Sequence, residues 1–140
     1  MAGTTHPGEA KRLNEKDRLV LAALRKCSKP ISAYDLIDDL KGHGVKAPPT
    51  VYRALGKLIE MGLAHKLESL NAFVACAHGQ SCAHSQDAVA FAVCEKCGSV
   101  EEFESKELTR TLSAWVAKRK FSLHKSTLEL RGICCSCADA

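Results

Sequence analysis

Two Cys-x-x-Cys pairs constrain this chain more than any other feature of its sequence. Cys94 and Cys97 form the first pair, Cys134 and Cys137 form the second, and residues 98–133 separate them. The short turn within a pair lets both thiolates approach one ion, and four thiolates complete the tetrahedral shell of a structural zinc site. No coordination position then stays open, so such a site holds a fold together rather than catalysing a reaction. The alternative is a pair of redox-active thiols, which two matched motifs disfavour.

The segment between the pairs is longer than the roughly 15–20 residues usually found between two zinc knuckles. One helix and one strand account for the excess, because "SKELTRTLSAWVAKRKF" has helical periodicity and "STLELRGIC" is typical of a strand. The stretch "AVAFAVC", which leads into the first pair, predicts another strand. We therefore expect a small α/β subdomain closed by zinc, which should unfold when the metal is lost.

The overall composition fits a soluble intracellular protein. The chain is 46% hydrophobic and 26% charged, and none of its apolar runs approaches the ~20 residues that a membrane span needs. The stretch "MAGTTHPGEAKRLNEKD" has no apolar core typical of a secretory signal, so we expect a cytoplasmic location. Eight cysteines in that reducing compartment favour metal binding over disulfides. The net charge of +4 permits nucleic-acid binding without requiring it.

Residues 11–62 predict three short helices. The first, in "LNEKDRLVLAALRKC", carries apolar residues at helical spacing. The second, in "PISAYDLIDDLKGHG", begins with a capping box in which Ser32 precedes Asp35 by three residues. The third, in "KAPPTVYRALGKLIEMG", opens after two prolines and ends at Gly62. Tight connections between three short helices suit a helix-turn-helix core.

The stretch "LAHKLESLNAFVAC" alternates like two strands around a turn at Leu70-Asn71. A hairpin directly after the third helix is typical of a winged helix. We therefore predict an α+β protein with an N-terminal winged helix-turn-helix and a C-terminal α/β zinc-binding domain, which the family resemblance described below implies to be a dimerisation domain. The expected boundaries are 1–76 for the winged helix, 77–87 for a linker and metal-site loop, and 88–140 for the second domain.

A second group of metal ligands is expected around this hairpin. If the turn centres between Leu70 and Asn71, His65 faces Cys76 across the two strands, close enough to share an ion. Further candidates come from the loop and from the segment after the first cysteine pair: His78, Cys82, His84, Glu101 and Glu102. Mixed nitrogen, sulfur and oxygen ligands suit zinc, and a thiolate disfavours magnesium, calcium and manganese. The competing interpretation is a half-buried histidine and an ordinary core cysteine.

Four stretches together carry a family resemblance: "ISAYDLIDDL", "PPTVYRALGKLIEMGLAHKLES", "CEKCG" and "GICCSC". With them the chain resembles the ferric uptake regulator superfamily, most closely its zinc-uptake regulator branch, from about residue 13 to residue 137. Members are dimeric, metal-dependent transcriptional repressors with an N-terminal winged helix and a C-terminal dimerisation domain. The combination of P-T-V-Y-R-A-L, H-K-L-E-S and two spaced Cys-x-x-Cys pairs is highly specific.

The resemblance implies a role for each matching position. The structural zinc would be held by Cys94, Cys97, Cys134 and Cys137. The regulatory zinc would be held by His65, Cys76, one histidine of the following loop and Glu102. Operator DNA would be contacted by Tyr34 and Arg53. An arginine on a recognition helix can pair bidentately with guanine, although Arg53 contacting only phosphate and Tyr34 simply packing are the alternatives.

The loop at residues 77–87 departs from the branch pattern because it is longer than expected. His84 keeps the step of eight residues from Cys76 that the branch shows, so we prefer it to His78 as the loop ligand. Cys82 is a further competitor. The chain also lacks the H-H-x-H run of iron-type members, and Cys76 as a ligand favours zinc over iron.

These observations together predict a zinc-responsive repressor with two zinc ions per chain, one structural and one regulatory. We expect a homodimer that binds palindromic double-stranded operator DNA and controls zinc-uptake genes, with no membrane partner and no small-molecule substrate. One alternative is an iron- or peroxide-sensing regulator of the same superfamily. Another, of a different class, is a zinc-thiolate redox chaperone. An enzyme is not expected, since no nucleophile–base pair is evident and the H-x-E…P-C-x-x-C signature of zinc deaminases is absent.

Overall fold

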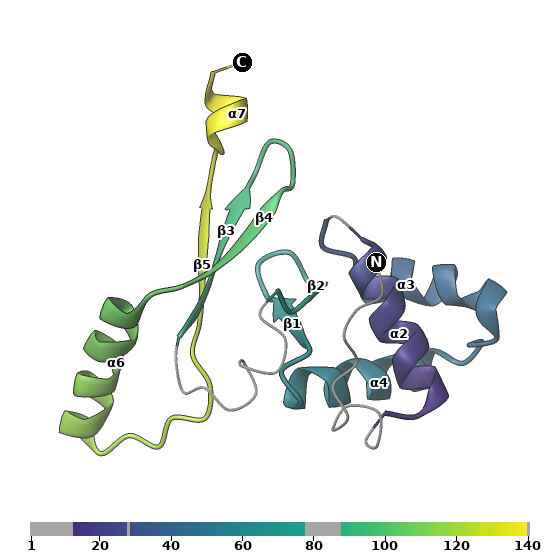
Figure 1. The fold of residues 1–140 in the computed structure, drawn as a ribbon, viewed down its shortest axis with the longest axis horizontal. Coiled ribbons are helices and arrows are strands. Elements are labelled where there is room, and N and C mark those ends of the chain that lie inside the picture. Colours follow the sequence, from purple (N-terminus) through teal and green to yellow (C-terminus); the bar gives the residue numbers. More distant parts are fainter. Residues whose placement is uncertain (1–12, 28, 78–87, 140) are drawn as a thin grey trace.

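The computed structural model of this protein describes residues 13–27, 29–77 and 88–139. Figure 1 shows a helical half at the right, a half built on an elongated sheet at the left, and a short hairpin between them. Within the described ranges, none of the helices is long and apolar enough to cross a membrane.

The first described helix, α2 (Glu15–Lys26), starts at a complete capping box. Asn14 Oδ1 accepts a hydrogen bond from the backbone N–H of Asp17 at 2.8 Å, and Asp17 Oδ2 accepts one from the N–H of Asn14 at 3.1 Å. These two bonds satisfy backbone donors that a helix start otherwise leaves unpaired. Val20 and Leu24 lie on the buried face, one helical turn apart. The helix thus has a fixed start and one face committed to the core.

The second helix, α3 (Ala33–Leu40), begins at the predicted cap. Ser32 accepts a hydrogen bond from the N–H of Asp35 at 3.1 Å, and its hydroxyl donates to the Asp35 carboxylate at 2.9 Å. A 3-10 turn, η1 (Lys41–His43), follows and ends at Gly44, whose φ of 90° favours glycine. The connection to the next helix is therefore tight, as a helix-turn-helix requires.

The third helix, α4 (Pro48–Glu60), starts at the first of the two prolines rather than after them. A proline fits the first helical position because the N–H that it lacks has no intrahelical partner there. Val51 and Leu55 are buried in the core that α2, α3 and α4 share. On the neighbouring face, Lys57 Nζ lies 2.9 Å from the buried Asp17 Oδ2 and so ties α4 to the start of α2.

The wing consists of β1 (Ala64–Leu67) and β2 (Ala72–Ala75), paired antiparallel. Its register differs from the predicted one, because His65 lies opposite Val74 rather than opposite Cys76. Cys76 lies past the end of β2, where its N–H donates to the carbonyl of Leu63 at 2.9 Å. The expectation that His65 and Cys76 are directly opposed was therefore wrong. The winged helix itself, and the α+β class, are confirmed.

The turn of the hairpin explains the shifted register. Its loop runs over residues 68–71, with the N–H of Leu70 donating to the carbonyl of Leu67 at 3.2 Å. Asn71 has a φ of 48°, a left-handed conformation that asparagine tolerates better than most residues. The loop thus centres one residue earlier than predicted, which moves every pair across the hairpin by two positions.

The second half is a three-stranded sheet with a helix and a terminal turn. Its strands are β3 (Val89–Cys94), β4 (Val100–Glu104) and β5 (Thr127–Gly132), in the order β4-β3-β5. β3 pairs antiparallel with β4 and parallel with β5. The parallel pair needs a crossover, which α6 (Lys106–Arg119) provides, and α7 (Cys135–Ala138) follows β5. The strand β4 was not predicted from the sequence.

The wing packs on one face of this sheet. A small core joins Leu67 of β1 to three alternate residues of β3: Val89, Phe91 and Val93. Val74 of β2 and Val100 of β4 pack against it from the sides. Leu67 and Phe91 are fully buried there. The two halves of the chain therefore share an apolar core, to which the helical half contributes through residues of the wing.

Candidate metal centres and nucleic-acid interface

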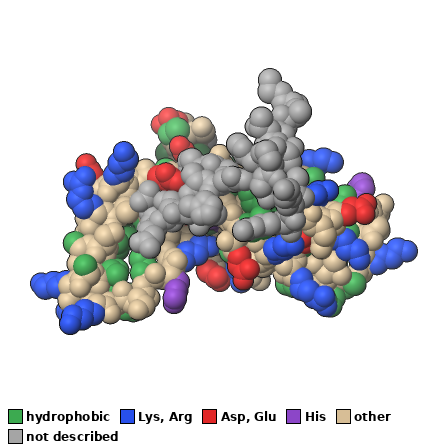
Figure 2. Space-filling view, turned by 60° about the horizontal axis from the view of Figure 1, so that its bottom comes forward, with side chains coloured by type: hydrophobic (Ala, Val, Ile, Leu, Met, Phe, Trp, Pro, Cys, Tyr) green, Lys and Arg blue, Asp and Glu red, His purple; other side chains and the backbone are tan. Residues whose placement is uncertain are grey.

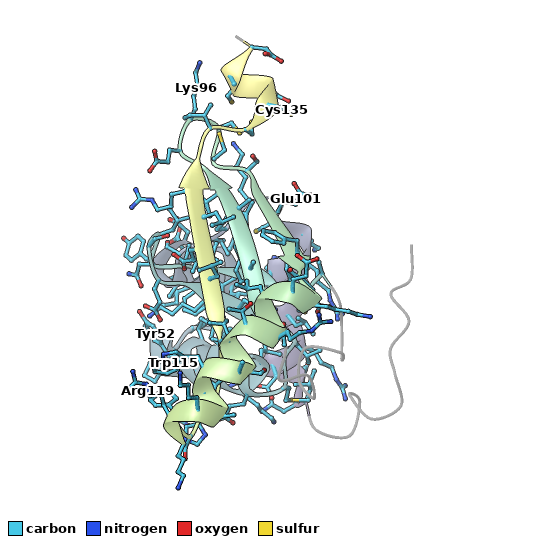
Figure 3. All side chains as sticks on the ribbon, turned by 90° about the vertical axis from the view of Figure 1, so that its left-hand side faces the viewer. Tyr52, Lys96, Glu101, Trp115, Arg119 and Cys135 are labelled. Carbon is cyan, nitrogen blue, oxygen red and sulfur yellow. The ribbon has the colours of Figure 1, made fainter. Side chains whose placement is uncertain are left out.

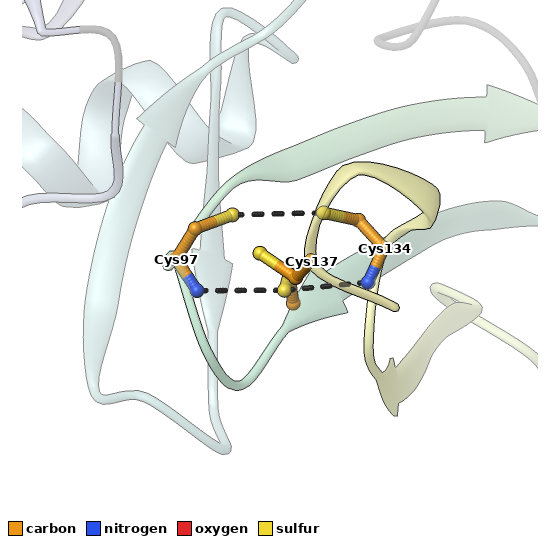
Figure 4. Close-up of side chains that lie close together, drawn as sticks. Cys97, Cys134 and Cys137 are labelled. Carbon is orange, nitrogen blue, oxygen red and sulfur yellow. Dashed lines mark hydrogen bonds between the residues drawn. The ribbon is translucent and has the colours of Figure 1, made fainter. Parts of the chain in front are cut away.

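The four cysteines of the two Cys-x-x-Cys pairs meet at the end of the sheet. Parallel pairing places Cys94, the last residue of β3, beside Gly132 of β5, so the turn after β3 and the turn after β5 face each other. The four Sγ atoms all lie within 4.8 Å of one another. Cys97 Sγ and Cys134 Sγ are 3.8 Å apart (Figure 4). The predicted helix and strand do loop out and return the second pair to the first.

Backbone N–H groups already point at one of these sulfurs. The N–H of Cys134 and the N–H of Cys97 approach Cys94 Sγ at 3.3 and 3.4 Å. These contacts, that of Cys134 first, lower the pKa of Cys94 to about 6. Contact with Cys134, together with burial, raises the pKa of Cys137 to about 12. Without a cation the cluster thus resists full ionisation, whereas a bound divalent ion would favour the thiolate form of all four cysteines and release their protons.

A second group of ligand atoms bridges the wing and the sheet. Ligand atoms of His65, Cys76 and Glu102 lie within 4.8 Å of one another. His65 comes from β1, Cys76 follows β2, and Glu102 comes from the unpredicted strand β4. Glu102 Oε1 lies 3.5 Å from His65 Nε2 and 3.7 Å from Cys76 Sγ, while Glu102 Oε2 accepts the N–H of Ala77 at 3.0 Å. His65 and Cys76 meet despite the shifted register, because diagonal neighbours share a face of a hairpin.

The environment of His65 fits a metal ligand. The side chain is 4% exposed, and neither ring nitrogen has a hydrogen bond of good geometry to any described residue. Buried polar atoms are normally paired, so these nitrogens are suited to bind a metal ion. Burial lowers the pKa of His65, but contacts with Cys76 and Glu102 outweigh it and raise the pKa to about 9. At 3.5 Å the approach of Glu102 is an ion-pair contact rather than a hydrogen bond.

Access and packing complete this second centre. A cavity of about 330 Å³ opens beside it and is lined by Cys76, Glu102 and Phe91, among others. The ring of Phe91 meets the His65 imidazole edge to face, with centroids 5.3 Å apart. Sequence reasoning missed Phe91, although its place in the middle of the apolar run "AVAFAVC" marks it as a core residue of the sheet.

Three candidate ligands of the loop, His78, Cys82 and His84, lie outside the described residues. The fourth ligand of the second centre therefore stays a prediction. Glu101 is exposed and lies opposite Ala92, one position along β4 from the Glu102 row, so the alternation of the strand turns it to the other face of the sheet. Of the two glutamates considered, the structure thus brings only Glu102 to His65.

The residues proposed to contact DNA lie on the helix-turn-helix. Tyr34, in the first turn of α3, is 80% exposed. Arg53 is exposed on α4, and its neighbour Tyr52 is 57% exposed. An aromatic side chain that is mostly solvated gains nothing from the core, so packing alone does not account for Tyr34. Both predicted DNA contacts therefore lie on the solvent-exposed surface of the helix-turn-helix.

Comparisons with known proteins place the chain in a family. The profile of the Ferric uptake regulator family matches residues 11–131. The zinc uptake regulation protein of Escherichia coli (strain K12) is 38% identical over 110 residues, which cover 78% of this chain but 63% of that protein. The chain thus matches less than two thirds of the length of this curated relative.

Solved structures agree. The structure of holo XcZur has a TM-score of 0.83 and 41% identity, covering 92% of this chain and 88% of that one. A zinc uptake regulator complexed with zinc and DNA has a TM-score of 0.82 and 35% identity, covering 93% and 87%. The family profile thus spans more than half of the chain, and two solved structures share its fold over more than nine tenths of its length. On these grounds the chain belongs to the Ferric uptake regulator family.

Proposed function

We propose that this protein is a cytoplasmic zinc-responsive transcriptional repressor that binds operator DNA as a dimer and controls zinc-uptake genes. The observation that carries the proposal is the cluster of His65, Cys76 and Glu102, because it takes two ligands from the wing and one from the sheet. An ion held there links the DNA-binding half to the rest of the molecule. The similarity to a zinc uptake regulation protein, and to a zinc uptake regulator solved in complex with zinc and DNA, supports the same function.

The two centres have different roles in this proposal. The four-cysteine centre is closed and lies at the end of the sheet, so it stabilises the second half. The occupancy of the centre at His65 rises and falls with the concentration of free zinc. A metal shifts a conformational equilibrium only by its preference for one state, and a coupling of roughly 1–3 kcal/mol changes operator affinity about 5–150-fold.

Exposed residues on the helical half support DNA binding. Tyr34 on α3 and Arg53 on α4 are exposed to solvent, which supports a role for α4 as the recognition helix. Figure 2 shows Lys and Arg side chains around the helical half, as a surface that meets phosphates requires. We propose Arg53 and Tyr34 as contacts to operator DNA.

The apolar surface of the second half supports dimerisation. None of the residues of α6 is buried. Large exposed hydrophobic side chains cluster on α6, on β5 and just after them: Leu112, Trp115, Phe121, Leu123, Leu128, Leu130 and Ile133. Figure 3 views this side of the molecule, with Trp115 and Arg119 labelled on the helix. Apolar surface of this extent marks a protein interface, and we propose residues 88–140 as the dimerisation domain, joined by residues 77–87 to a winged helix at 1–76.

The test is a binding titration against a library of palindromic operators at fixed salt and buffered free metal, comparing zinc, iron(II) and manganese(II). We expect two zinc ions per chain and zinc-selective binding. If iron(II) or manganese(II) promotes operator binding and zinc does not, the protein is a sensor of another metal. Two bound zinc ions without metal-dependent DNA binding would refute the repressor.

The matched variants are Arg53→Ala and Arg110→Ala, which remove the same charge from α4 and from α6. We expect Arg53→Ala to lower operator affinity about 5–150-fold, since a bidentate arginine–guanine pair is worth roughly 1–3 kcal/mol. Zinc content should not change, and Arg110→Ala should bind as the unaltered protein does. The assignment of Arg53 to operator contact would be contradicted if the unaltered protein binds operator no more tightly than random DNA and Arg53→Ala does the same.

A further inference from the structure

One row of side chains crosses the sheet beneath the wing. Phe91, at the centre of β3, is paired with Glu102 on β4 and with Glu129 on β5. Residues paired across neighbouring strands project from the same face of a sheet. The row therefore consists of an aromatic ring flanked by two carboxylates, all on the side where the wing lies.

Each member of the row contacts a different part of the wing. Glu102 lies against the base of the hairpin, within 3.5 Å of His65 Nε2. The Phe91 ring packs on the same imidazole. Glu129 reaches the opposite end, where its Oε2 accepts the backbone N–H of Ser69 at 3.1 Å. The wing is thus held at its base by one edge strand of the sheet and at its tip by the other.

The contact between Glu129 and the wing tip is a specific hydrogen bond to a turn. Ser69 sits in the four-residue loop whose backbone is fixed by the left-handed Asn71. Hydrogen bonds from Ser69 hold the pKa of Glu129 below its ordinary value, so the carboxylate is ionised at neutral pH. Charge-assisted hydrogen bonds are stronger than neutral ones, although exposure to solvent weakens this one.

The geometry of the hairpin gives this contact a consequence at the metal centre. Leu67, the last residue of β1, is buried on the sheet between His65, which lies toward the base of the hairpin, and the turn at residues 68–71, which forms its tip. If the tip is released, the hairpin can rock on Leu67, and His65 then moves relative to Glu102. The ligands His65 and Cys76 of the wing keep their positions relative to Glu102 of the sheet only while both the base and the tip of the hairpin are held.

We propose that Glu129 is a positioning residue for the regulatory metal, which it never touches. Its carboxylate holds the wing turn on β5, and this keeps His65 and Cys76 aligned with Glu102 on β4. The inference rests on the proposed function only in taking the centre at His65 as the regulatory one. It adds a residue, on the far edge of the sheet, that none of the ligand motifs contains.

The test measures cobalt(II) and zinc affinity of the full-length protein without DNA, by competition with a chelator. The variants are Glu129→Ala, which removes the acceptor, and Glu129→Gln, whose amide oxygen can still accept the Ser69 N–H. The control is Glu101→Ala, which removes the same charge from the opposite face of the sheet, next to Glu102 in the chain. Absorption of cobalt(II)–thiolate complexes distinguishes the four-cysteine centre from the centre with one cysteine.

We expect Glu129→Ala to weaken the centre at His65 about threefold to tenfold, as the loss of one hydrogen bond predicts, and to leave the four-cysteine centre unchanged. Glu129→Gln should restore most of the affinity, and Glu101→Ala should bind as the unaltered protein does. The proposal is overturned if Glu129→Ala binds normally, if Glu129→Gln fails to restore binding, or if Glu101→Ala loses as much. Since DNA is not involved, failure here is distinct from failure of the repressor function.

Discussion

The metal-free centre should behave as a buried ion pair centred on His65, and this can be tested by replacing Glu102 with glutamine. Burial alone would lower the pKa of His65, yet contacts with Cys76 and Glu102 raise it from 6.5 to about 9. Glu102→Gln removes a carboxylate that lies 3.5 Å from the imidazole and keeps the shape of the side chain. We expect the pKa of His65 to fall in this variant.

The magnitude follows from the interval between the two pKa values. A pKa difference of one is worth about 1.4 kcal/mol, so a rise from 6.5 to about 9 corresponds to at most about 3.5 kcal/mol in favour of the charged form. Because the folded pKa lies above the unfolded one, this stabilisation is complete below pH 6.5 and is lost as the pH rises to about 9. Zinc requires the neutral ring, so metal affinity changes in the opposite direction and rises with pH through this window.

The assay is an NMR titration of the His65 ring in metal-free protein, with denaturant unfolding at the two ends of the pH window. His65→Gln should remove the loss of stability on going from pH 6.5 to pH 9, and the exposed His124→Gln should not. The reasoning is refuted if His65 titrates at or below 6.5. It is refuted equally if His65→Gln and the unaltered protein lose the same stability across the window.

Three further perturbations test the scaffold. Leu67→Ala, in the core between wing and sheet, should lower the free energy of unfolding by about 2–5 kcal/mol in denaturant melts; a loss below 1 kcal/mol would mean that the wing does not carry this core. Asn14→Ala should cost about 1 kcal/mol through the lost helix cap, and an unchanged midpoint would argue against the capping box. Cys97→Ser should remove one zinc ion per chain by metal analysis, whereas the exposed Cys135→Ser should retain it; equal zinc content in both would contradict the four-cysteine centre.

The helices were predictable because their signals are local. The cap at Ser32 and the buried stripe of α4 depend on residues within one or two turns, and both are found where the sequence places them. The strand β4 was missed because three of its five residues are glutamates, which disfavour strands in isolation. Its partner β3 stabilises it through a pairing that the local sequence does not report.

The metal centres show the same division between features set by local sequence and features set by long-range pairing. The four cysteines could be grouped from spacing alone, because each turn brings its own pair together. The register of the wing could not, since a four-residue loop and a left-handed Asn71 decide it. His65 and Cys76 still meet, because a shift of two positions preserves the face of a strand. The roles of Phe91 and Glu129 depend on how three distant strands pair, which a single sequence does not reveal.

The core beneath the wing makes this protein poorly suited to exchange of its parts. A chimera cut within residues 77–87 would transplant the hairpin with the helices and leave the sheet behind, so Leu67 and Val74 would meet a foreign surface. Such a hybrid would be unstable even if both donors fold well. A functional exchange among relatives has to move the inner face of the hairpin together with the sheet. The residues on both sides of this interface must therefore be exchanged together, although they are not contiguous in the sequence.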